Sequence, residues 1–157
     1  KNETGKVCKA CTPGKYSSDK GNDKDSKCIG CDPGRWSSVE AASSIDACTL
    51  CGVGKFSTDF GAFNETESCK PCIPGTYSSK EGNDKDSKCT SCVPGKYGDS
   101  PGATSEKSCK VCIDVKYSDE IGAVGIKSCQ FCENGKLPNK QKTGKYCFSN
   151  PYNAFVY

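Results

Sequence analysis

The sequence of 157 residues contains no histidine and no methionine, only one tryptophan, and few apolar side chains. Without histidine, neither a Cys–His nor a Ser–His nucleophile can be built. Residues counted as hydrophobic make up 34% of the chain, and 15 of them are cysteine. The other apolar side chains are too few and too scattered to form one contiguous core, so hydrophobic burial alone cannot offset the conformational entropy lost on folding.

Two further absences exclude classes of partner. The 22 basic and 19 acidic residues are interspersed, with no run of five like charges, so the sequence predicts no binding to nucleic acid or to an anionic membrane. No apolar stretch approaches the roughly 20 residues that span a bilayer. With no signal peptide and no methionine, we expect a processed product or an internal window of a longer protein.

The cysteines are the main feature that is present. Fifteen cysteines in 157 residues is a composition typical of oxidising compartments, where disulfides replace a large hydrophobic core. The sequence therefore predicts a secreted protein or one on the extracellular surface.

The cysteines recur at a nearly constant interval, which is lengthened only once. Cys-x-x-Cys pairs begin at Cys8, Cys28, Cys48, Cys69, Cys89, Cys109 and Cys129. This period of about 20 residues predicts seven tandem repeats. Their boundaries are 8–27, 28–47, 48–68, 69–88, 89–108, 109–128 and 129–147. Residues 1–7 are expected to be an upstream linker or the end of a preceding repeat.

Each pair is followed by a similar phrase, which reads Thr-Pro-Gly-Lys-Tyr-Ser at residues 12–17. Pro-Gly fits a type II turn, and the residues after it suit a short strand. A second glycine turn, at Gly21 in the first repeat, leads the chain back to the next cysteine. We therefore expect an elongated rod of seven β-hairpin-like repeats with little or no helix, whose stability is local and additive.

One aromatic or apolar position recurs in every repeat. These side chains are predicted to pack over the disulfides rather than to stack on a ligand. They are Tyr16, Trp36, Phe56, Tyr77, Tyr97, Tyr117 and Leu137.

Paired cysteines at this spacing could also bind zinc or carry out redox chemistry. A string of zinc sites should alternate between two spacer lengths, whereas the spacer here has the same length in every case but one. Zinc would also leave the last three cysteines one ligand short. A redox Cys-x-x-Cys occurs once, at the start of a helix, rather than seven times before turns. Disulfides are therefore favoured, and no cofactor or metal is predicted.

The ends of the array favour one disulfide pairing. If the second cysteine of each pair bonds the first cysteine of the next pair, the single Cys147 closes the last loop. Only Cys8 is left, to pair with an upstream cysteine. A crossed scheme, as in tumour-necrosis-factor-receptor modules, would join Cys11 to Cys31 and impose an alternation over two repeats that is absent. The predicted bridges are Cys11–Cys28, Cys31–Cys48, Cys51–Cys69, Cys72–Cys89, Cys92–Cys109, Cys112–Cys129 and Cys132–Cys147.

Three smaller signals remain. Asn2 and Asn64 begin N-glycosylation sequons, and Asn64 lies in the one repeat with an extra residue, so N-linked glycans are expected. The segments 22–25 and 83–86 could suggest calcium binding, but they lack the EF-hand order of ligands, so solvated turns are favoured. Residues 148–157 hold four aromatics and are predicted to be a docking tail or the start of another domain.

The repeated phrase, Cys-x-x-Cys-x-Pro-Gly-Lys-Tyr-Ser followed by Gly and Ser-x-x-Cys, resembles the ephrin-receptor-like cysteine-rich repeat. This repeat is similar in style to tumour-necrosis-factor-receptor and epidermal-growth-factor-like modules. It occurs in long tandem arrays on large secreted and surface proteins, especially of protists and algae. The resemblance covers residues 8–147 and implies no catalytic residues. The sixth copy lacks Pro-Gly, and the seventh lacks the aromatic and the second glycine.

These observations predict a structural protein rather than an enzyme. We expect a stapled rod segment of an extracellular filament, stalk or cell coat, of which a surface appendage such as a flagellar one would be an example. Its partners would be other protein chains, reached through self-association. The alternative is a ligand-binding or adhesive receptor ectodomain.

Overall fold

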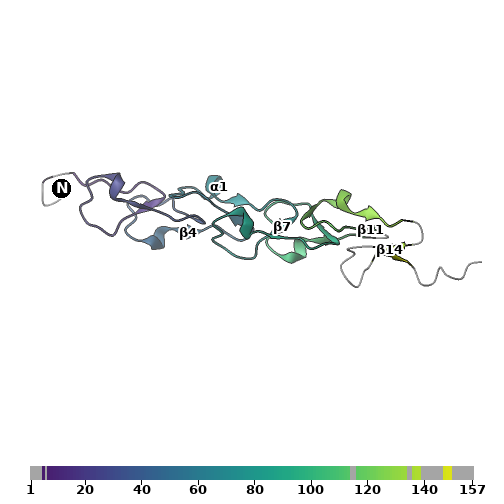
Figure 1. The fold of residues 1–157 in the computed structure, drawn as a ribbon. Coiled ribbons are helices and arrows are strands. Elements are labelled where there is room, and N and C mark those ends of the chain that lie inside the picture. The colour runs from purple at the N-terminus through teal and green to yellow at the C-terminus, as the bar shows by residue number, and fades with distance from the viewer. Residues whose placement is uncertain (1–4, 6, 114–115, 134–135, 139–146, 150–157) are drawn as a thin grey trace, which may run out of the picture. The chain divides into compact units, whose positions relative to one another are not determined.

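The structure is a computed structural model that describes residues 5, 7–113, 116–133, 136–138 and 147–149. Figure 1 shows the chain as a ribbon, coloured from purple at the N-terminus to yellow at the C-terminus. The chain divides into two compact units. Unit 1 contains residues 1–71 and 80–89, and unit 2 contains residues 72–79 and 90–157. The two units are described separately below. Asn2 and residues 150–157 of the predicted tail lie outside the described residues.

Very short strands alternate with single helical turns in both units. The elements of unit 1 are β1 (Lys15–Tyr16), η1 (Asp25–Lys27), β2 (Ile29–Gly30), β3 (Arg35–Trp36), η2 (Ile45–Ala47), β4 (Thr49–Leu50), β5 (Lys55–Phe56), α1 (Glu65–Ser68), β6 (Lys70–Pro71) and η3 (Asp86–Lys88). Those of unit 2 are β7 (Thr76–Tyr77), β8 (Thr90–Ser91), β9 (Lys96–Gly98), η4 (Glu106–Ser108), β10 (Lys110–Val111), β11 (Lys116–Tyr117), β12 (Ala123–Val124), η5 (Ile126–Ser128), β13 (Gln130–Phe131), β14 (Lys136–Pro138) and β15 (Cys147–Ser149).

Six antiparallel hairpins of the described residues each join the strand after one Cys-x-x-Cys pair to the two residues inside the next. In addition, β12 pairs in parallel with β9, and β14 pairs antiparallel with β15. In the first hairpin, β1 pairs with β2, with Lys15 opposite Gly30 and Tyr16 opposite Ile29. The same arrangement joins β3 to β4, β5 to β6, β7 to β8, β9 to β10 and β11 to β13. The predicted fold class is confirmed, because the chain is small and disulfide-rich, consists mostly of short β-hairpins and contains almost no helix.

The Pro-Gly turns have the predicted type II form. In the first repeat, Gly14 has φ +85° and the N–H of Lys15 donates to the carbonyl of Thr12 at 3.2 Å. A positive φ at the third residue of such a turn is the feature that requires glycine. The following four repeats carry the same bond from the residue after the glycine, with φ between +72° and +84° at Gly34, Gly54, Gly75 and Gly95.

The second turn also uses a left-handed residue. Gly21 has φ +76°, and the equivalent Gly61 has φ +71°. The second repeat departs from this pattern, because Ala41 occupies the position and adopts φ +57°. An L-residue other than glycine is strained in this region, because its Cβ approaches the following carbonyl.

Substituting Ala41→Gly is therefore expected to raise the free energy of unfolding by about 1 kcal/mol. Thermal unfolding followed by circular dichroism measures the change. The matched control is Ala42→Gly, one position later, where Ala42 is buried and has no positive φ. That substitution should lower stability by about 0.5–1 kcal/mol. Two changes of the same sign would contradict the strain at Ala41.

Hydrogen bonds and close contacts link the first repeat to the next two. Tyr16 forms a parallel bridge with Ala42 of the second repeat, and the N–H of Ala41 donates to the carbonyl of Cys11 at 2.8 Å. Gly14 lies directly against Gly61 of the third repeat, since a Cβ placed on Gly14 would overlap the Gly61 carbonyl, 2.8 Å from its carbon. The repeats are thus coupled further than the expected local and additive stability implies.

The buried centre consists of disulfides and small residues. Cys31 and Cys51 are 0% exposed, and Ala62 and Ser57 are also buried. The recurring aromatics in the first six repeats are only half-buried, and Leu137 in the seventh is 37% exposed. The reason is the spacing of the backbones, because a contact as close as that of Gly14 with Gly61 leaves no room for a ring between them. The aromatics therefore flank the centre instead of filling it.

Candidate functional site

The most regular feature of the molecule is its ladder of disulfides. The second cysteine of one pair is bonded to the first cysteine of the next, with Cα–Cα distances of 5.6–5.8 Å in the first three bridges, within the range usual for disulfides. The bridges with described geometry are Cys11–Cys28, Cys31–Cys48, Cys51–Cys69, Cys92–Cys109, Cys112–Cys129 and Cys132–Cys147. Cys72 and Cys89 are also disulfide-bonded, whereas Cys8 carries an exposed free thiol.

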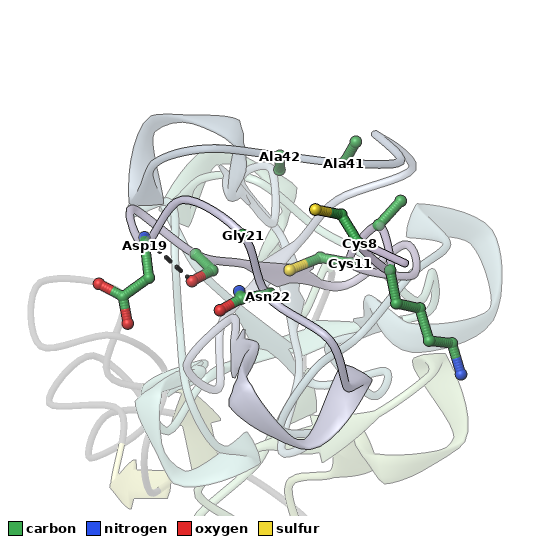
Figure 2. A pocket seen from close by; sticks show the side chains of 10 residues that line it. Cys8, Cys11, Asp19, Gly21, Asn22, Ala41 and Ala42 are labelled. Carbon is green, nitrogen blue, oxygen red and sulfur yellow. Dashed lines mark hydrogen bonds between the residues drawn. The ribbon is translucent and has the colours of Figure 1, made fainter. Parts of the chain in front are cut away.

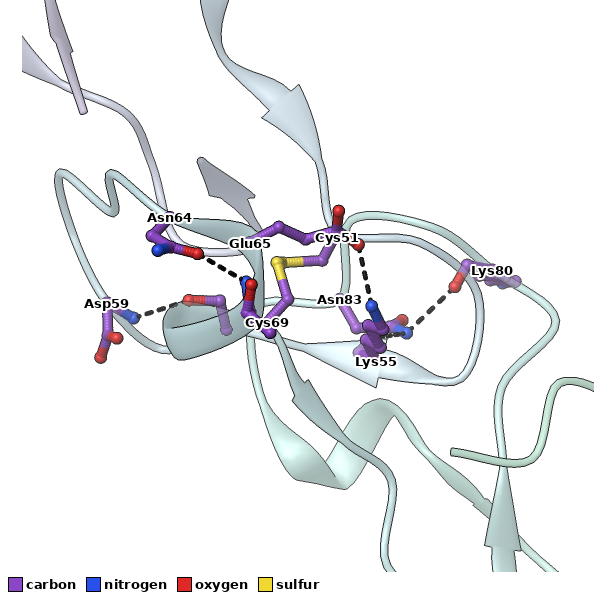
Figure 3. Close-up of a disulfide and its surroundings, with 10 residues drawn as sticks. Cys51, Lys55, Asp59, Asn64, Glu65, Cys69, Lys80 and Asn83 are labelled. Carbon is purple, nitrogen blue, oxygen red and sulfur yellow. Dashed lines mark hydrogen bonds and ion pairs between the residues drawn. A yellow bond between two sulfur atoms is a disulfide. The ribbon is translucent and has the colours of Figure 1, made fainter. Parts of the chain in front are cut away.

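Backbone hydrogen bonds hold several of the bridges beside a turn glycine. The N–H of Cys31 donates to the carbonyl of Gly14, and the N–H of Cys51 donates to that of Gly34, both at 2.8 Å. Figure 3 shows the Cys51–Cys69 bridge next to α1 and Lys55 of β5. Because strand residues and cysteines alternate along the chain, each hairpin lies next to a disulfide. The pairing in the native protein remains a prediction, which mass mapping of non-reduced peptides would check.

Ion pairs close the same loops as the disulfides. Lys15 of β1 pairs with Asp25, the first residue of η1, and the N–H of Thr12 donates to the second carboxylate oxygen of Asp25 at 3.2 Å. The hydrogen bond from Lys15, supported by that from Thr12, lowers the pKa of Asp25 from 3.8 to about 2. Equivalent pairs occur at 2.8 Å between Lys55 and Glu65 and at 2.7 Å between Lys96 and Glu106.

The second and sixth repeats lack this acidic residue, and their basic side chains bind elsewhere. Ile45 replaces the acid in the second repeat, where Arg35 donates to the carbonyl of Cys48 at 2.9 Å. In the sixth repeat, Ile126 takes the position and the ammonium of Lys116 lies 4.5 Å from the centre of the Phe131 ring. The even mixture of charges in the sequence does not by itself predict these ion pairs. The signal that would have found them is a lysine of the strand followed, at one fixed interval, by Asp or Glu in alternate repeats.

The depressed pKa of Asp25 gives a testable titration. The contribution of this pair to stability is present above the unfolded pKa of 3.8 and is lost as the pH falls through about 2. In an NMR titration, the Asp25 carboxyl carbon should therefore have a midpoint near pH 2. Lys15→Gln should raise the pKa of Asp25 toward 3.8, whereas Lys107→Gln, which removes the same charge from unit 2, should leave it unchanged. An Asp25 midpoint near 3.8 in the unaltered chain would refute the interaction.

In segment 22–25, which was considered for calcium, the aspartate carboxylates form ion pairs with lysines. Asp25 binds Lys15, and Asp23 pairs with Lys27 at 2.8 Å. Among the described residues, no group of three or more His, Cys, Asp or Glu side chains is placed to hold a metal ion. In the same residues, no helix has the length and hydropathy of a membrane span, and α1 has only four residues.

The extra residue of the third repeat lies in the helical turn that carries the Asn64 sequon. Other repeats have a three-residue 3-10 turn at this place, whereas α1 has four residues, with an i to i+4 bond from the N–H of Cys69 to the carbonyl of Glu65. Asn64 is the N-cap of α1, and its side-chain oxygen accepts from the N–H of Thr66 at 2.8 Å (Figure 3). Asn64 is half-buried and Thr66 is exposed.

One comparison with known proteins found a match. Residues 59–109 match the family model described as tyrosine-protein kinase ephrin type A/B receptor-like. The match runs from the end of the third repeat to the first cysteine of the sixth. Together with the regularly spaced disulfides, this match is consistent with tandem cysteine-rich repeats. No curated protein matches the chain.

Proposed function

We propose that this chain is a non-catalytic structural segment of an extracellular assembly, a stapled rod within a filament, stalk or cell coat. The repeats matched by the ephrin-receptor-like family suggest an extracellular domain. The disulfides are consistent with an oxidising compartment. In this proposal the chain associates with other copies or other protein chains.

The observation that carries this proposal is the covalent path through the disulfides. From Cys11 the path crosses to Cys28, continues along the chain to Cys31 and crosses again to Cys48. A pulling force follows this path and bypasses the loop inside each bridge, whose ends are separated by 17 positions in the sequence. Such a loop could otherwise extend by about 50 Å, at roughly 3.5 Å per residue. Resistance to extension is a property that a stalk or filament needs and that ligand binding does not.

The contacts between repeats support the same function. Within unit 1, the turn glycines Gly14 and Gly34 lie directly against Gly61 and Gly82, each of which belongs to the second repeat after their own. Because the same contact recurs at these two steps, the arrangement can be lengthened by adding copies without a new kind of contact.

Electron microscopy of native material, with an antibody against this chain, tests the proposal. We expect the label on regular polymers or stalks at a constant interval. A monodisperse monomer that co-purifies with a soluble ligand would contradict it and favour the alternative, a ligand-binding or adhesive receptor ectodomain.

Glycosylation at Asn64 is part of the proposal. The sequon lies on a helical turn that already tolerates an insertion, and Thr66 is accessible. Expression in a eukaryotic secretory system should give a chain whose mass falls on treatment with a peptide N-glycosidase. Asn64→Gln should abolish the mass decrease that is due to the glycan at Asn64. Asn22→Gln, at a position outside any sequon, should leave the mass decrease unchanged. An Asn64→Gln chain of unchanged glycan mass would contradict occupancy at this site.

A further inference from the structure

A pocket of about 330 Å³ opens at the edge of unit 1 formed by the first repeat. Figure 2 shows Cys8, Cys11 and Asn22 around it, with Ala41 and Ala42 of the second repeat on the other side. The pocket thus combines the free thiol of Cys8 with the backbone of two successive repeats. A comparison with the equivalent position one repeat later indicates what kind of segment this pocket binds.

The equivalent space one repeat later is filled. There, Cys28–Cys31 replaces Cys8–Cys11, Ala42 replaces Asn22, and Gly61 replaces Ala41. The segment from Cys11 to Ser17 fills that space, because Cys11 is bonded to Cys28, β1 pairs with β2, and the N–H of Ser17 donates to the carbonyl of Ala42 at 3.0 Å. The pocket at the edge is therefore the same site without its strand.

The backbone groups around the pocket are those that bind such a strand elsewhere. The N–H of Cys31 donates to Gly14, and the N–H of Ala41 donates to Cys11. Their counterparts at the edge are the N–H groups of Cys11 and Gly21, which have no hydrogen-bond acceptor within the described residues. The carbonyl of Asn22 accepts from Lys9 at 2.7 Å, in place of the bond that a strand like β1 would supply.

The Asn22 side chain gives an independent indication. Residues 21–28 and 82–89 are identical in sequence, so Asn22 and Asn83 occupy equivalent positions. The amide of Asn83 donates to the carbonyl of Lys55, a strand residue of the preceding repeat, at 3.0 Å (Figure 3). Asn22 is only 8% exposed and lines the pocket, yet its side chain forms no hydrogen bond to any described residue. The Asn22 amide therefore lacks the strand carbonyl that the equivalent Asn83 amide binds.

We infer that this pocket binds the strand of one further repeat of the same type, whose cysteine forms a disulfide with Cys8 as Cys11 does with Cys28. The strand that fits has the pattern Cys-x-x-Gly-x-aromatic-Ser. Its glycine must approach Ala41 as Gly14 approaches Gly61, and its fifth residue must offer a carbonyl to Asn22, as Lys55 does to Asn83. The inference does not depend on whether the protein is structural or a receptor.

The test inserts a copy of residues 11–27 between Val7 and Cys8 of the whole chain, which places the copied cysteine as far before Cys8 as Cys11 lies before Cys28. In a glutathione redox buffer, we expect Cys8 to bond the copied cysteine and to lose its reactivity toward maleimide. NMR should show amide exchange at Cys11 and Gly21 at least tenfold slower than in the unextended chain. The control insert carries Gly14→Ala and Tyr16→Ser in the copy, and it should leave Cys8 mainly reactive or glutathionylated.

Asn22→Ala tests the role of the amide. It should speed exchange at Gly21 at least fivefold in the extended chain and less than twofold in the unextended chain, where the amide has no strand to hold. Equal bridging of Cys8 by the two inserts would overturn the inference. So would Cys8–Cys8 dimers of the unextended chain in which the amides of Cys11 and Gly21 are protected, because a second copy would then occupy the pocket.

Discussion

Replacing Gly34 by alanine is expected to destabilise unit 1 by about 3 kcal/mol, through two costs that add. Gly34 has φ +82°, a conformation that costs an alanine about 1–2 kcal/mol. An added Cβ would also overlap the carbonyl of Gly82, two repeats further on, at 2.8 Å from its carbon, and backbone cannot move aside as a flexible side chain can. The forced separation adds the cost of overpacking.

Gly52→Ala is the matched control for this prediction. Gly52 lies in the next repeat, has no positive φ, and a Cβ placed on it would meet nothing within 4 Å. We expect a change within about 0.5 kcal/mol. Thermal unfolding and amide exchange measure both variants, and in Gly34→Ala the exchange at Gly82 should accelerate together with that at Gly34. Similar effects of the two substitutions would show that the close approach to Gly82 does not exist.

The case of Gly34 illustrates why the sequence predicted the turns but not the contacts between second neighbours. Pro-Gly at residues 33–34 has a sufficient local explanation in the type II turn, and the positive φ bears it out. The same glycine also has to lack a Cβ for its contact with Gly82, which belongs to the second repeat after its own. Glycine satisfies both the turn and the close contact. A single sequence therefore gives no separate signal for the contact.

The composition of the centre could have been predicted better. Tyr16 and its counterparts attracted attention because large apolar side chains usually form the core. The residues after the second turn glycine, such as Ala62 and Asn83, are instead among the buried ones, and their small size recurs as regularly as the aromatics. In a ribbon of closely spaced backbones, burial selects small side chains and disulfides. The family match at residues 59–109 concerns the type of repeat and does not indicate which of its side chains are buried.

The disulfides could be predicted in number and spacing because sulfur chemistry and chain period leave few choices. The ion pairs that accompany them could not be inferred from charge content, because most exposed lysines and acids have no fixed partner. Their position became clear only when the strand placed Lys55 beside the first turn of α1, 2.8 Å from Glu65. A charge pattern becomes informative when it is compared at the period of the repeat rather than along the chain.

Removing the Cys51–Cys69 bridge, by Cys51→Ala with Cys69→Ala, is expected to lower the free energy of unfolding by about 3 kcal/mol, the cost of releasing a loop of this size in the unfolded chain. Denaturation under oxidising conditions measures the loss. Cys8→Ala is the control, because Cys8 forms no disulfide with another described residue and its thiol is exposed, and it should change stability by less than about 0.5 kcal/mol.

The distribution of that loss tests how the repeats are coupled. Cys51 is 0% exposed, its N–H donates to Gly34, and its carbonyl accepts from Gly82, each at 2.8 Å. Opening the bridge frees the segment that carries both bonds, so amide exchange should accelerate at Cys51 and Gly82 as well as inside the loop. If acceleration stops at the ends of the 51–69 loop, the repeats are independent and coupled only by the chain. If it extends to Gly82, the disulfide also holds the backbone of a neighbouring repeat in place, and neighbouring repeats unfold together rather than one loop at a time.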